Sequence, residues 1–195
     1  MNCPSCGRPI SFEEKYTKIL ACGYCNSILE LGRKELNKIG EQSEFIEFPS
    51  IFKVGKSTEW KNKEIYVKGQ MRYEYDGGFF DRFFVLIDGK EFLIEEDDGL
   101  KKVLESGKWQ KSSDTILDKP VGENVVIGGQ EVFIQETGIF KLVNIKGFVN
   151  TDLIVGKDYE YLDGIVEGKK IIIEKELGSN RIKVLSEADI LEDGK

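Results

Sequence analysis

Four cysteines in two C-x-x-C pairs are the residues of this sequence with the most specific chemistry. Cys3 and Cys6 form one pair, and Cys22 and Cys25 form a second pair after fifteen intervening residues. Zinc prefers four soft ligands in a tetrahedron, and each C-x-x-C motif supplies two thiolates from one tight turn. The spacing lies inside the range of zinc sites and accounts for every cysteine in the chain. We therefore expect one structural Zn²⁺ per chain, with iron in a rubredoxin-like site as the main rival.

The segments around the second pair indicate a hairpin that positions the ligands. Residues 16–20 and 27–31 are rich in β-branched and apolar side chains, which favour strands. Gly7 and Asn26 follow the last cysteine of each pair, where the chain must turn and tolerance of positive φ is useful. These features predict a zinc ribbon over residues 1–40. Such a ribbon either staples a segment too small for its own core, with or without a protein contact, or docks onto a partner or nucleic acid.

Charge narrows the classes of function. The chain carries a formal charge of −7, unevenly distributed. Residues 1–40 hold six Lys or Arg against four Glu, whereas the remainder holds 22 Lys or Arg against 31 Asp or Glu. A nucleic-acid binder presents a basic face to phosphates, so the acidic body disfavours nucleic acid and anionic membranes as partners. The chain has no histidine, which excludes Ser-His-Asp and Cys-His catalysis but leaves carboxylate, Lys or Tyr chemistry open.

Composition indicates a soluble globular protein of the cytoplasm. Hydrophobic residues make up 40% of the 195 residues and charged residues 32%, as in ordinary globular domains. No apolar run approaches the roughly 18 residues that a membrane span needs, and the N-terminal sequence has no apolar core of a signal peptide. We therefore expect no membrane insertion and a reducing compartment, where paired cysteines more often bind metal than form disulfides.

From residue 46 onward the sequence consists of short runs rich in Ile, Val, Phe and Tyr, which favour β-strands. The runs are 65–71, 79–87, 91–94, 132–134, 140–143, 159–161 and 170–174. Asp88-Gly89 is a strong hairpin signal between two of them. Short helices are expected at 33–39, at 100–105 and near the C-terminus. The fold class is therefore mainly β, with an antiparallel body after the ribbon.

An internal repeat divides this body. Val54-Gly55 and Val121-Gly122 each stand ten residues before a β-branched strand, and the two copies lie 67 residues apart. Repetition at a fixed offset indicates related supersecondary units. We expect two small β-barrel or sandwich units at 46–112 and 115–190, separate or packed as one domain. Coincidence is the alternative, because Val-Gly and β-branched runs are common.

Glycine and aromatic positions in both units carry a family resemblance. These positions are Gly55, Trp60, Ile65, Val67, Gly69, Gly89, Phe92, Leu93 and Gly99, followed by the segments 147–150 and 156–159. They resemble the uncharacterised bacterial family called domain of unknown function 4178, whose members often carry a C-x-x-C ribbon in front. The chain departs from that family at Phe80, Phe83 and Phe92, where Trp is usual. Asn150 also replaces the usual Pro, and the resemblance implies no catalytic residues.

Two further clusters allow both a functional and a plain interpretation. The acidic run 95–98 could bind Ca²⁺ or Mg²⁺ through oxygens, but it lacks the spacing of an EF-hand, and a solvated turn is the plainer interpretation. Alternation along a strand places Phe80 and Phe84 on one face and Phe79 and Phe83 on the other. One pair therefore lies on a partner surface, or both pairs are buried between layers.

Our leading hypothesis is a non-enzymatic zinc-binding adaptor or accessory protein that contacts an unidentified protein partner. It rests on the ribbon, the missing histidine, the acidic body and the scattered cations, such as Arg72, expected on exposed strand faces. The alternative is a small-ligand sensor or enzyme with a histidine-free pocket between the β-units. One open, concave pocket lined by paired carboxylates with perturbed pKa values would count against the adaptor. A wide cleft between the units, with polar groups converging on it, would favour the alternative. A nucleic-acid-binding ribbon, with strongly salt-dependent binding, is the third possibility.

Overall fold

The computed structural model describes residues 1–11, 17–33, 35–108, 110–111 and 119–190. This part of the chain contains β-strands and no helix, so the predicted all-β fold is confirmed. No helix in the described ranges could span a membrane. The strands are β1 (Ile19–Ala21), β2 (Ser27–Leu31), β3 (Leu36–Glu41), β4 (Ser57–Trp60), β5 (Lys63–Tyr75), β6 (Gly78–Ile87), β7 (Lys90–Asp97), β8 (Leu100–Ser106), β9 (Gln110–Lys111), β10 (Asn124–Ile127), β11 (Gln130–Val149), β12 (Asp158–Val166), β13 (Lys169–Glu176) and β14 (Arg181–Glu187).

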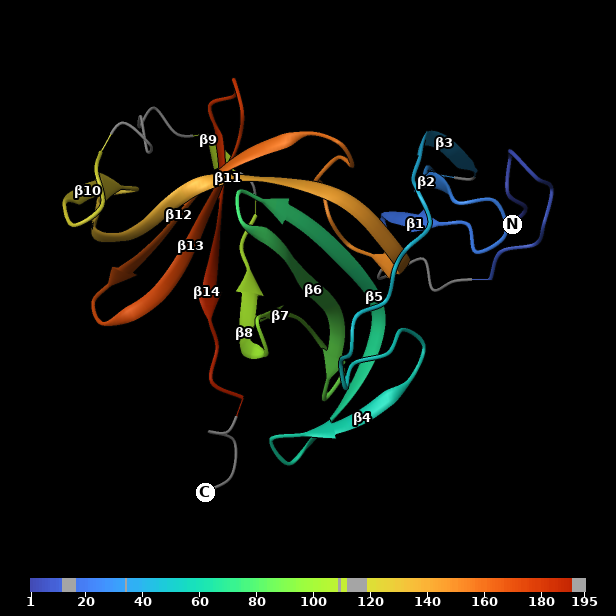
Figure 1. Ribbon diagram of the computed structural model, residues 1–195, viewed down its shortest axis with the longest axis horizontal. Helices are drawn as coiled ribbons and strands as arrows, with labels where there is room; N and C mark the ends of the chain where they lie inside the picture. The colour runs from blue at the N-terminus through green and yellow to red at the C-terminus, as the bar shows by residue number, and fades with distance from the viewer. Residues whose placement is uncertain (12–16, 34, 109, 112–118, 191–195) are drawn as a thin grey trace.

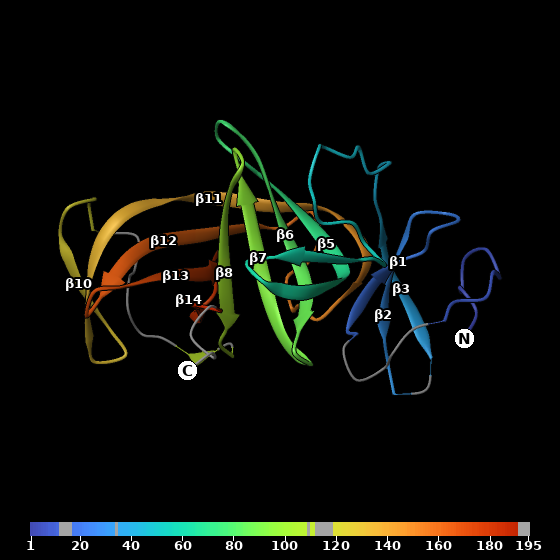
Figure 2. The ribbon, with the colours of Figure 1, turned by 90° about the horizontal axis from the view of Figure 1, so that it is seen from below.

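Eight antiparallel strands form one closed barrel. Their order is β5-β6-β7-β8-β14-β13-β12-β11, and β11 pairs back onto β5. Figures 1 and 2 show the green strands β5–β8 and the orange and red strands β11–β14 as two halves of this barrel. Closure leaves neither four-stranded half with unpaired edges, which would otherwise invite aggregation. The two units expected from the sequence therefore each contribute four strands to a single barrel rather than closing separately.

The two halves begin with the same local structure. The Gly55 N–H donates to the Val67 carbonyl at 2.8 Å, and the Gly122 N–H donates to the Ile134 carbonyl at 2.9 Å. Strand β4 pairs with β5 in the register with which β10 pairs with β11. A β-bulge follows Val67 in one half and Ile134 in the other. These matches agree with the internal repeat and its offset of 67 residues.

Apolar side chains pack in layers on both sides of the barrel wall. Phe80 and Phe84 belong with the interior cluster, which also holds Tyr73 and Phe140. Phe83 is fully buried in a second cluster with the β4 segment on the other face of β5–β8. A third cluster lies in the second half, with β10 against it. The predicted alternation of the phenylalanines is confirmed, and only Phe79 among the four is exposed, at 48%.

The helical expectations were wrong wherever the structure describes them. Residues 36–41 form β3, which pairs with β2 as the third strand of the ribbon. Residues 100–106 form β8, because Val103 and Leu104 pair with β7 and bury against it. Strand pairing here overrides the helix propensity of the neighbouring Lys and Glu residues. Residues 191–195, residue 16 of the first predicted ribbon strand and the predicted unit boundary at 112–115 lie outside the described residues.

Residues 42–51, which we call the strap, connect the ribbon to the barrel across its outer wall. Arg72 was expected to be exposed but is 5% exposed, because the strap covers it. Its guanidinium lies 4.1 Å from the Phe48 ring centroid and pairs with Asp81 at 2.7 Å. The Gln42 side chain also accepts a hydrogen bond from the Ile145 N–H at 2.8 Å. The strap is thus held by a buried cation and by hydrogen bonds between the Gln42 side chain and the backbone of Ile145.

A glycine pair lets the two halves meet at the β5–β11 seam. Gly69 pairs directly with Gly147. A Cβ atom on Gly69 would lie 2.4 Å from the Phe148 carbonyl oxygen, and Gly147 has a φ of +72°. No other residue type fits this close approach without moving the backbone. The seam therefore depends on two of the glycines in the chain.

Candidate functional site

The two cysteine pairs occupy two turns of the same construction. The Gly7 N–H donates to the Cys3 carbonyl at 2.9 Å, and the Asn26 N–H donates to the Cys22 carbonyl at 3.0 Å. Gly7 has a φ of +72° and Asn26 a φ of +54°, so the expected need for positive φ at both positions is confirmed. Such turns free two sulfur atoms to point in one direction.

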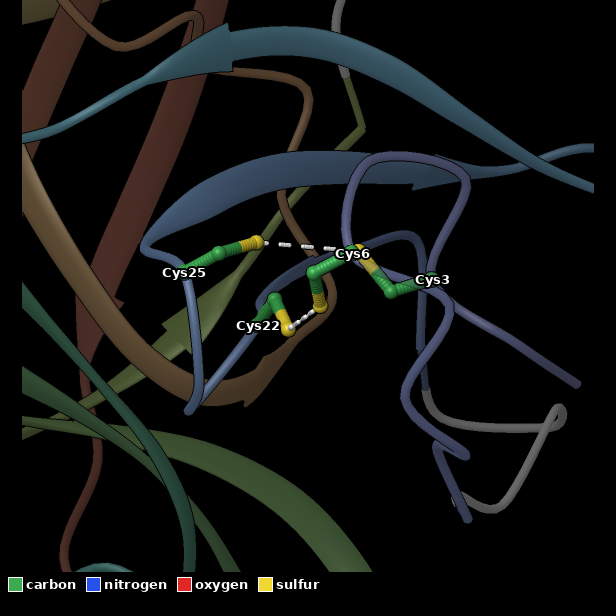
Figure 3. Close-up of side chains that lie close together, drawn as sticks. All are labelled: Cys3, Cys6, Cys22 and Cys25. Carbon is green, nitrogen blue, oxygen red and sulfur yellow. Dashed lines mark hydrogen bonds between the residues drawn. The ribbon is translucent and has the colours of Figure 1, made fainter.

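The structure brings all four predicted ligands together. Their Sγ atoms lie within 4.8 Å of one another. Cys3 is 3.8 Å from Cys25 and Cys6 is 3.8 Å from Cys22, sulfur to sulfur (Figure 3). A tetrahedron with metal–sulfur bonds of about 2.3 Å has edges of about 3.8 Å, whereas a disulfide needs about 2.05 Å. The four cysteines can therefore hold one metal ion, and they are free thiols here.

The thiols of the centre do not ionise alike. Hydrogen bonds from the side chain and backbone of Ser27 lower the pKa of Cys25 to about 6. The Arg8 backbone N–H lowers the pKa of Cys6, but burial and the hydrogen bonds with the other cysteines outweigh it and raise the value to about 12. Four thiolates this close need a cation to ionise together, so metal binding must release protons.

The ribbon continues the sheet of the barrel. Strand β1 pairs with the end of β11, with Ile19 opposite Val149. Ile19 and Ile28 belong to the barrel's interior cluster, and Lys18 pairs with Asp152 at 2.9 Å. In Figure 1 the blue ribbon strands lie beside the end of β11. The four cysteines therefore lie in a segment that shares hydrogen bonds and core with the barrel.

A second candidate site lies at one mouth of the barrel, where a cavity of about 260 Å³ is lined by residues of both halves. Its charged walls are Arg82, Glu95, Asp97 and Lys102 from the first half and Glu136 and Asp163 from the second. Its aromatic walls are Tyr75, Phe80, Phe140 and Tyr161. The charged groups carry a formal charge of −2. Polar and aromatic groups converging on one concave site are the usual features of a binding pocket.

The floor of this cavity is a buried ion network across the barrel. Arg82 on β6 donates to Glu174 on β13, the strand on the opposite side of the barrel. It also donates to Glu95 at 2.8 Å, and Glu95 accepts a further bond from Lys102 at 3.0 Å. Burial disfavours the charge of Arg82, but Glu174 and Glu95 hold its pKa well above its ordinary value. The charges of Arg82, Glu95 and Lys102 are therefore paired with one another or with Glu174 and have a structural role.

Two carboxylates of the cavity are less well compensated. Burial raises the pKa of Asp163 to about 6, since Lys102 stands 3.9 Å away and offsets the burial only in part. Burial and the neighbouring Asp98 raise the pKa of Asp97 as well. The Asp97 Oδ1 atom is buried and has no hydrogen-bond partner. Carboxylates with raised pKa values in a cavity are candidates for a functional site.

The second half shapes the opposite wall of the cavity. The Tyr161 hydroxyl donates to Glu136 at 2.6 Å. Gly138 faces this ring, and a Cβ atom there would lie 2.6 Å from it. Tyr161 can thus line the cavity because the residue opposite has no side chain.

Sequence reasoning missed this cavity. The run 95–98 was interpreted as a solvated turn, but only Asp98 and Gly99 form the turn, while Glu95 and Asp97 line the cavity. Among the described residues, the four cysteines are the one group of three or more acidic or cysteine side chains whose ligand atoms converge, so the run 95–98 does not gather such a group. The sequence did contain one sign of the cavity, which is Arg82 in the aromatic strand 78–87. An arginine that is buried in such a strand requires an acidic partner.

Replacing Asp163 by Asn tests whether the buried, ionised carboxylate destabilises the fold. A pKa raised by folding means that Asp163 supports the fold when protonated and loses this contribution as pH rises through about 6. We expect Asp163→Asn to raise the free energy of unfolding by about 2 kcal/mol at pH 8 and to change it little at pH 4. Urea unfolding at both pH values measures this. Asp158→Asn, at an exposed position of the same strand, is the control, and an equal gain at both pH values would contradict the prediction.

Comparison of the chain with protein-family models, with curated proteins and with solved structures gives no match. The resemblance to domain of unknown function 4178 therefore stays a prediction. The function has to be argued from the two sites themselves.

Proposed function

We propose that this protein is a small-ligand-binding β-barrel with a structural zinc ribbon. The observation that carries the proposal is the cavity of about 260 Å³ between the two halves of the barrel. Its charged and aromatic walls come from both halves, and the ligand-binding alternative predicts a pocket in this position, between the two β-units. Its carboxylates with raised pKa values count against a purely adaptor role. The free thiols of the ribbon support a reducing, cytoplasmic location.

Zinc is the metal that the ribbon supports best. An all-thiolate donor set in a tetrahedral arrangement suits zinc or an iron site, and the two C-x-x-C turns match a closed structural site with four protein ligands. The ribbon's own apolar cluster is small: its buried members are Cys3, Leu20, Cys22, Leu29 and Leu36. Two of these five residues are proposed metal ligands, so a bound metal would stabilise a segment whose apolar core is too small to do so alone.

Replacing Cys22 by Ser tests whether bound zinc stabilises the ribbon and the barrel. We expect the wild-type protein to be colourless with one zinc per chain, and Cys22→Ser to lose it. Because β1 pairs with β11 and Ile19 reaches the interior cluster, the melting temperature of the barrel is expected to fall by about 4 °C or more. Elemental analysis and thermal unfolding measure both effects, with Ser5→Ala as control. A red, iron-loaded protein would refute zinc, and an unchanged melting temperature would refute this stabilisation.

Closing the cavity tests ligand binding. Glu136 lies at an exposed position of the cavity rim, so Glu136→Trp can cover the mouth without replacing a core residue. In a ligand-observed NMR screen of small polar compounds, we expect at least one compound to bind the wild type and to bind this variant at least tenfold more weakly. Glu131→Trp, also exposed on β11, is the matched control. Binders that respond equally to both variants, or no binders, would contradict a ligand site in the barrel mouth.

The adaptor role is a second candidate, favoured by the strap. Ile46 is 71% exposed, and Phe48 and Ile51 are also exposed. Three large apolar side chains within six residues form a surface that a protein partner can cover. This surface is separate from both the cysteine centre and the cavity.

Co-purification from the native host tests the adaptor role. We compare the wild type with an Ile46→Ser, Ile51→Ser variant. A stoichiometric partner is expected with the wild type, reduced at least tenfold with the variant. Ile139→Ser, at an exposed position on β11, controls for the loss of any surface isoleucine. Equal recovery from all three proteins, or no stoichiometric partner, would refute the adaptor role of the strap.

A further inference from the structure

The barrel-mouth cavity has an excess of negative charge that its own cations do not satisfy. Arg82 is engaged by Glu174 and Glu95, and Lys102 by Glu95. Asp97 and Asp163 remain incompletely compensated, since Asp163 has only Lys102 at 3.9 Å, whereas Glu136 is exposed to solvent and accepts a hydrogen bond from Tyr161. Removing carboxylates from water without a compensating partner is costly. A bound group with positive charge would compensate them.

One of these carboxylates points specifically to a hydrogen-bond donor. The Asp97 Oδ1 atom is buried and has no partner within the protein. Buried carboxylate oxygens are normally hydrogen-bonded. A group that satisfies Asp97 must therefore carry an N–H or O–H donor, and a positive charge on that group would also compensate the carboxylate.

Aromatic rings complete the walls of the cavity. The centroids of Tyr75 and Phe80 lie 6.0 Å apart, those of Phe80 and Phe140 6.1 Å, and those of Phe140 and Tyr161 6.1 Å. Cations bind to the faces of aromatic rings, and amine recognition sites commonly combine such rings with carboxylates. An aliphatic chain would pack on the same rings. The lining therefore suits an organic cation with an apolar body.

A metal ion fits this lining less well. Among the described residues, the carboxylates of the cavity do not converge closely enough to ligate one ion. Divalent cations such as Mg²⁺ and Ca²⁺ need six or more oxygen ligands in a close shell. The aromatic walls offer no such ligands. An anion would be repelled by the formal charge of −2 at the site.

We propose that the barrel mouth binds a small primary ammonium compound, with its charged nitrogen at Asp97 and Asp163 and its apolar part against Phe80, Phe140 and Tyr161. This rests on the proposed ligand-binding function and names the class of ligand. The volume of about 260 Å³ is sufficient for a small ligand of this kind. An ammonium with N–H donors binds better than a quaternary one, because only the former can satisfy the Asp97 oxygen.

NMR titration of isoleucine methyl groups tests the proposal. Ile172 lines the cavity, and Ile127, in the third apolar cluster, is an internal control. The probes are n-butylammonium, tetramethylammonium, butyrate and Mg²⁺. We expect n-butylammonium to shift the Ile172 signal and not the Ile127 signal, and to bind at least tenfold more tightly than tetramethylammonium or butyrate.

Charge-removing variants locate the nitrogen. Asp97→Asn and Asp163→Asn are each expected to weaken n-butylammonium binding at least tenfold, whereas Asp88→Asn, whose carboxylate pairs with Lys63 outside the cavity, leaves it unchanged. Asp163→Asn is expected to fold at least as well as the wild type, so it decides the test if Asp97→Asn is unstable.

Three results would overturn the inference. The first is tighter binding of butyrate or Mg²⁺ than of n-butylammonium, and the second is n-butylammonium binding that survives both aspartate variants. The third is no response of Ile172 to any probe. None of these refutes ligand binding itself, because the compound screen on the wild-type protein is not restricted to cationic compounds.

Discussion

The ion pair between Arg82 and Glu174 is the interaction on which the barrel interior depends. It joins strands on opposite sides of the barrel, and both side chains are almost fully buried, at 2% and 0% exposure. A buried ion pair adds little net stability compared with apolar side chains of the same size, but loss of one partner is strongly destabilising. Because Arg82 comes from one half and Glu174 from the other, the pair favours one way of assembling the two halves. The two halves are similar because of the repeat, but Arg82 occurs in one and Glu174 in the other, so this pair forms in only one arrangement of the halves.

The long strand β11 connects the barrel to the ribbon. Its twenty residues pair in turn with β10, β12, β5 and β1, so a single strand contributes to the cavity wall, the seam and the ribbon. Gly138 makes room for Tyr161 in the cavity, and Gly147 lets β11 approach β5 at the seam. A metal held by the four cysteines would act on the barrel through the hydrogen bonds between β1 and β11. The ribbon is therefore an extension of the barrel sheet rather than an independent module.

Local pattern was enough to predict the cysteine centre, most strands and the hairpin at Asp88-Gly89, because these depend on residues close in the sequence. The strand at 100–106 was missed because its helix-favouring lysines are outweighed by pairing with β7 and β14, strands that are not evident from the segment itself. The burial of Arg72 and Glu95 and the partial burial of Asp97 were missed for a related reason. Charged residues are exposed by default, and their partners lie on other strands or on the strap. The cavity arises from such pairings, so it could not be derived from any one segment.

The two ends of the barrel differ in the sign of their charge. The acidic mouth holds the cavity described above, whereas a cavity of about 490 Å³ is lined by Phe84, Leu93 and Lys183 toward the other ends of these strands and has a formal charge of +2. Lys183 is buried, and burial lowers its pKa. An apolar interior would stabilise the barrel more simply, since buried charges rarely add net stability. Charged layers that weaken a fold are expected where they serve binding. These buried charges are among the features that support the proposed ligand binding.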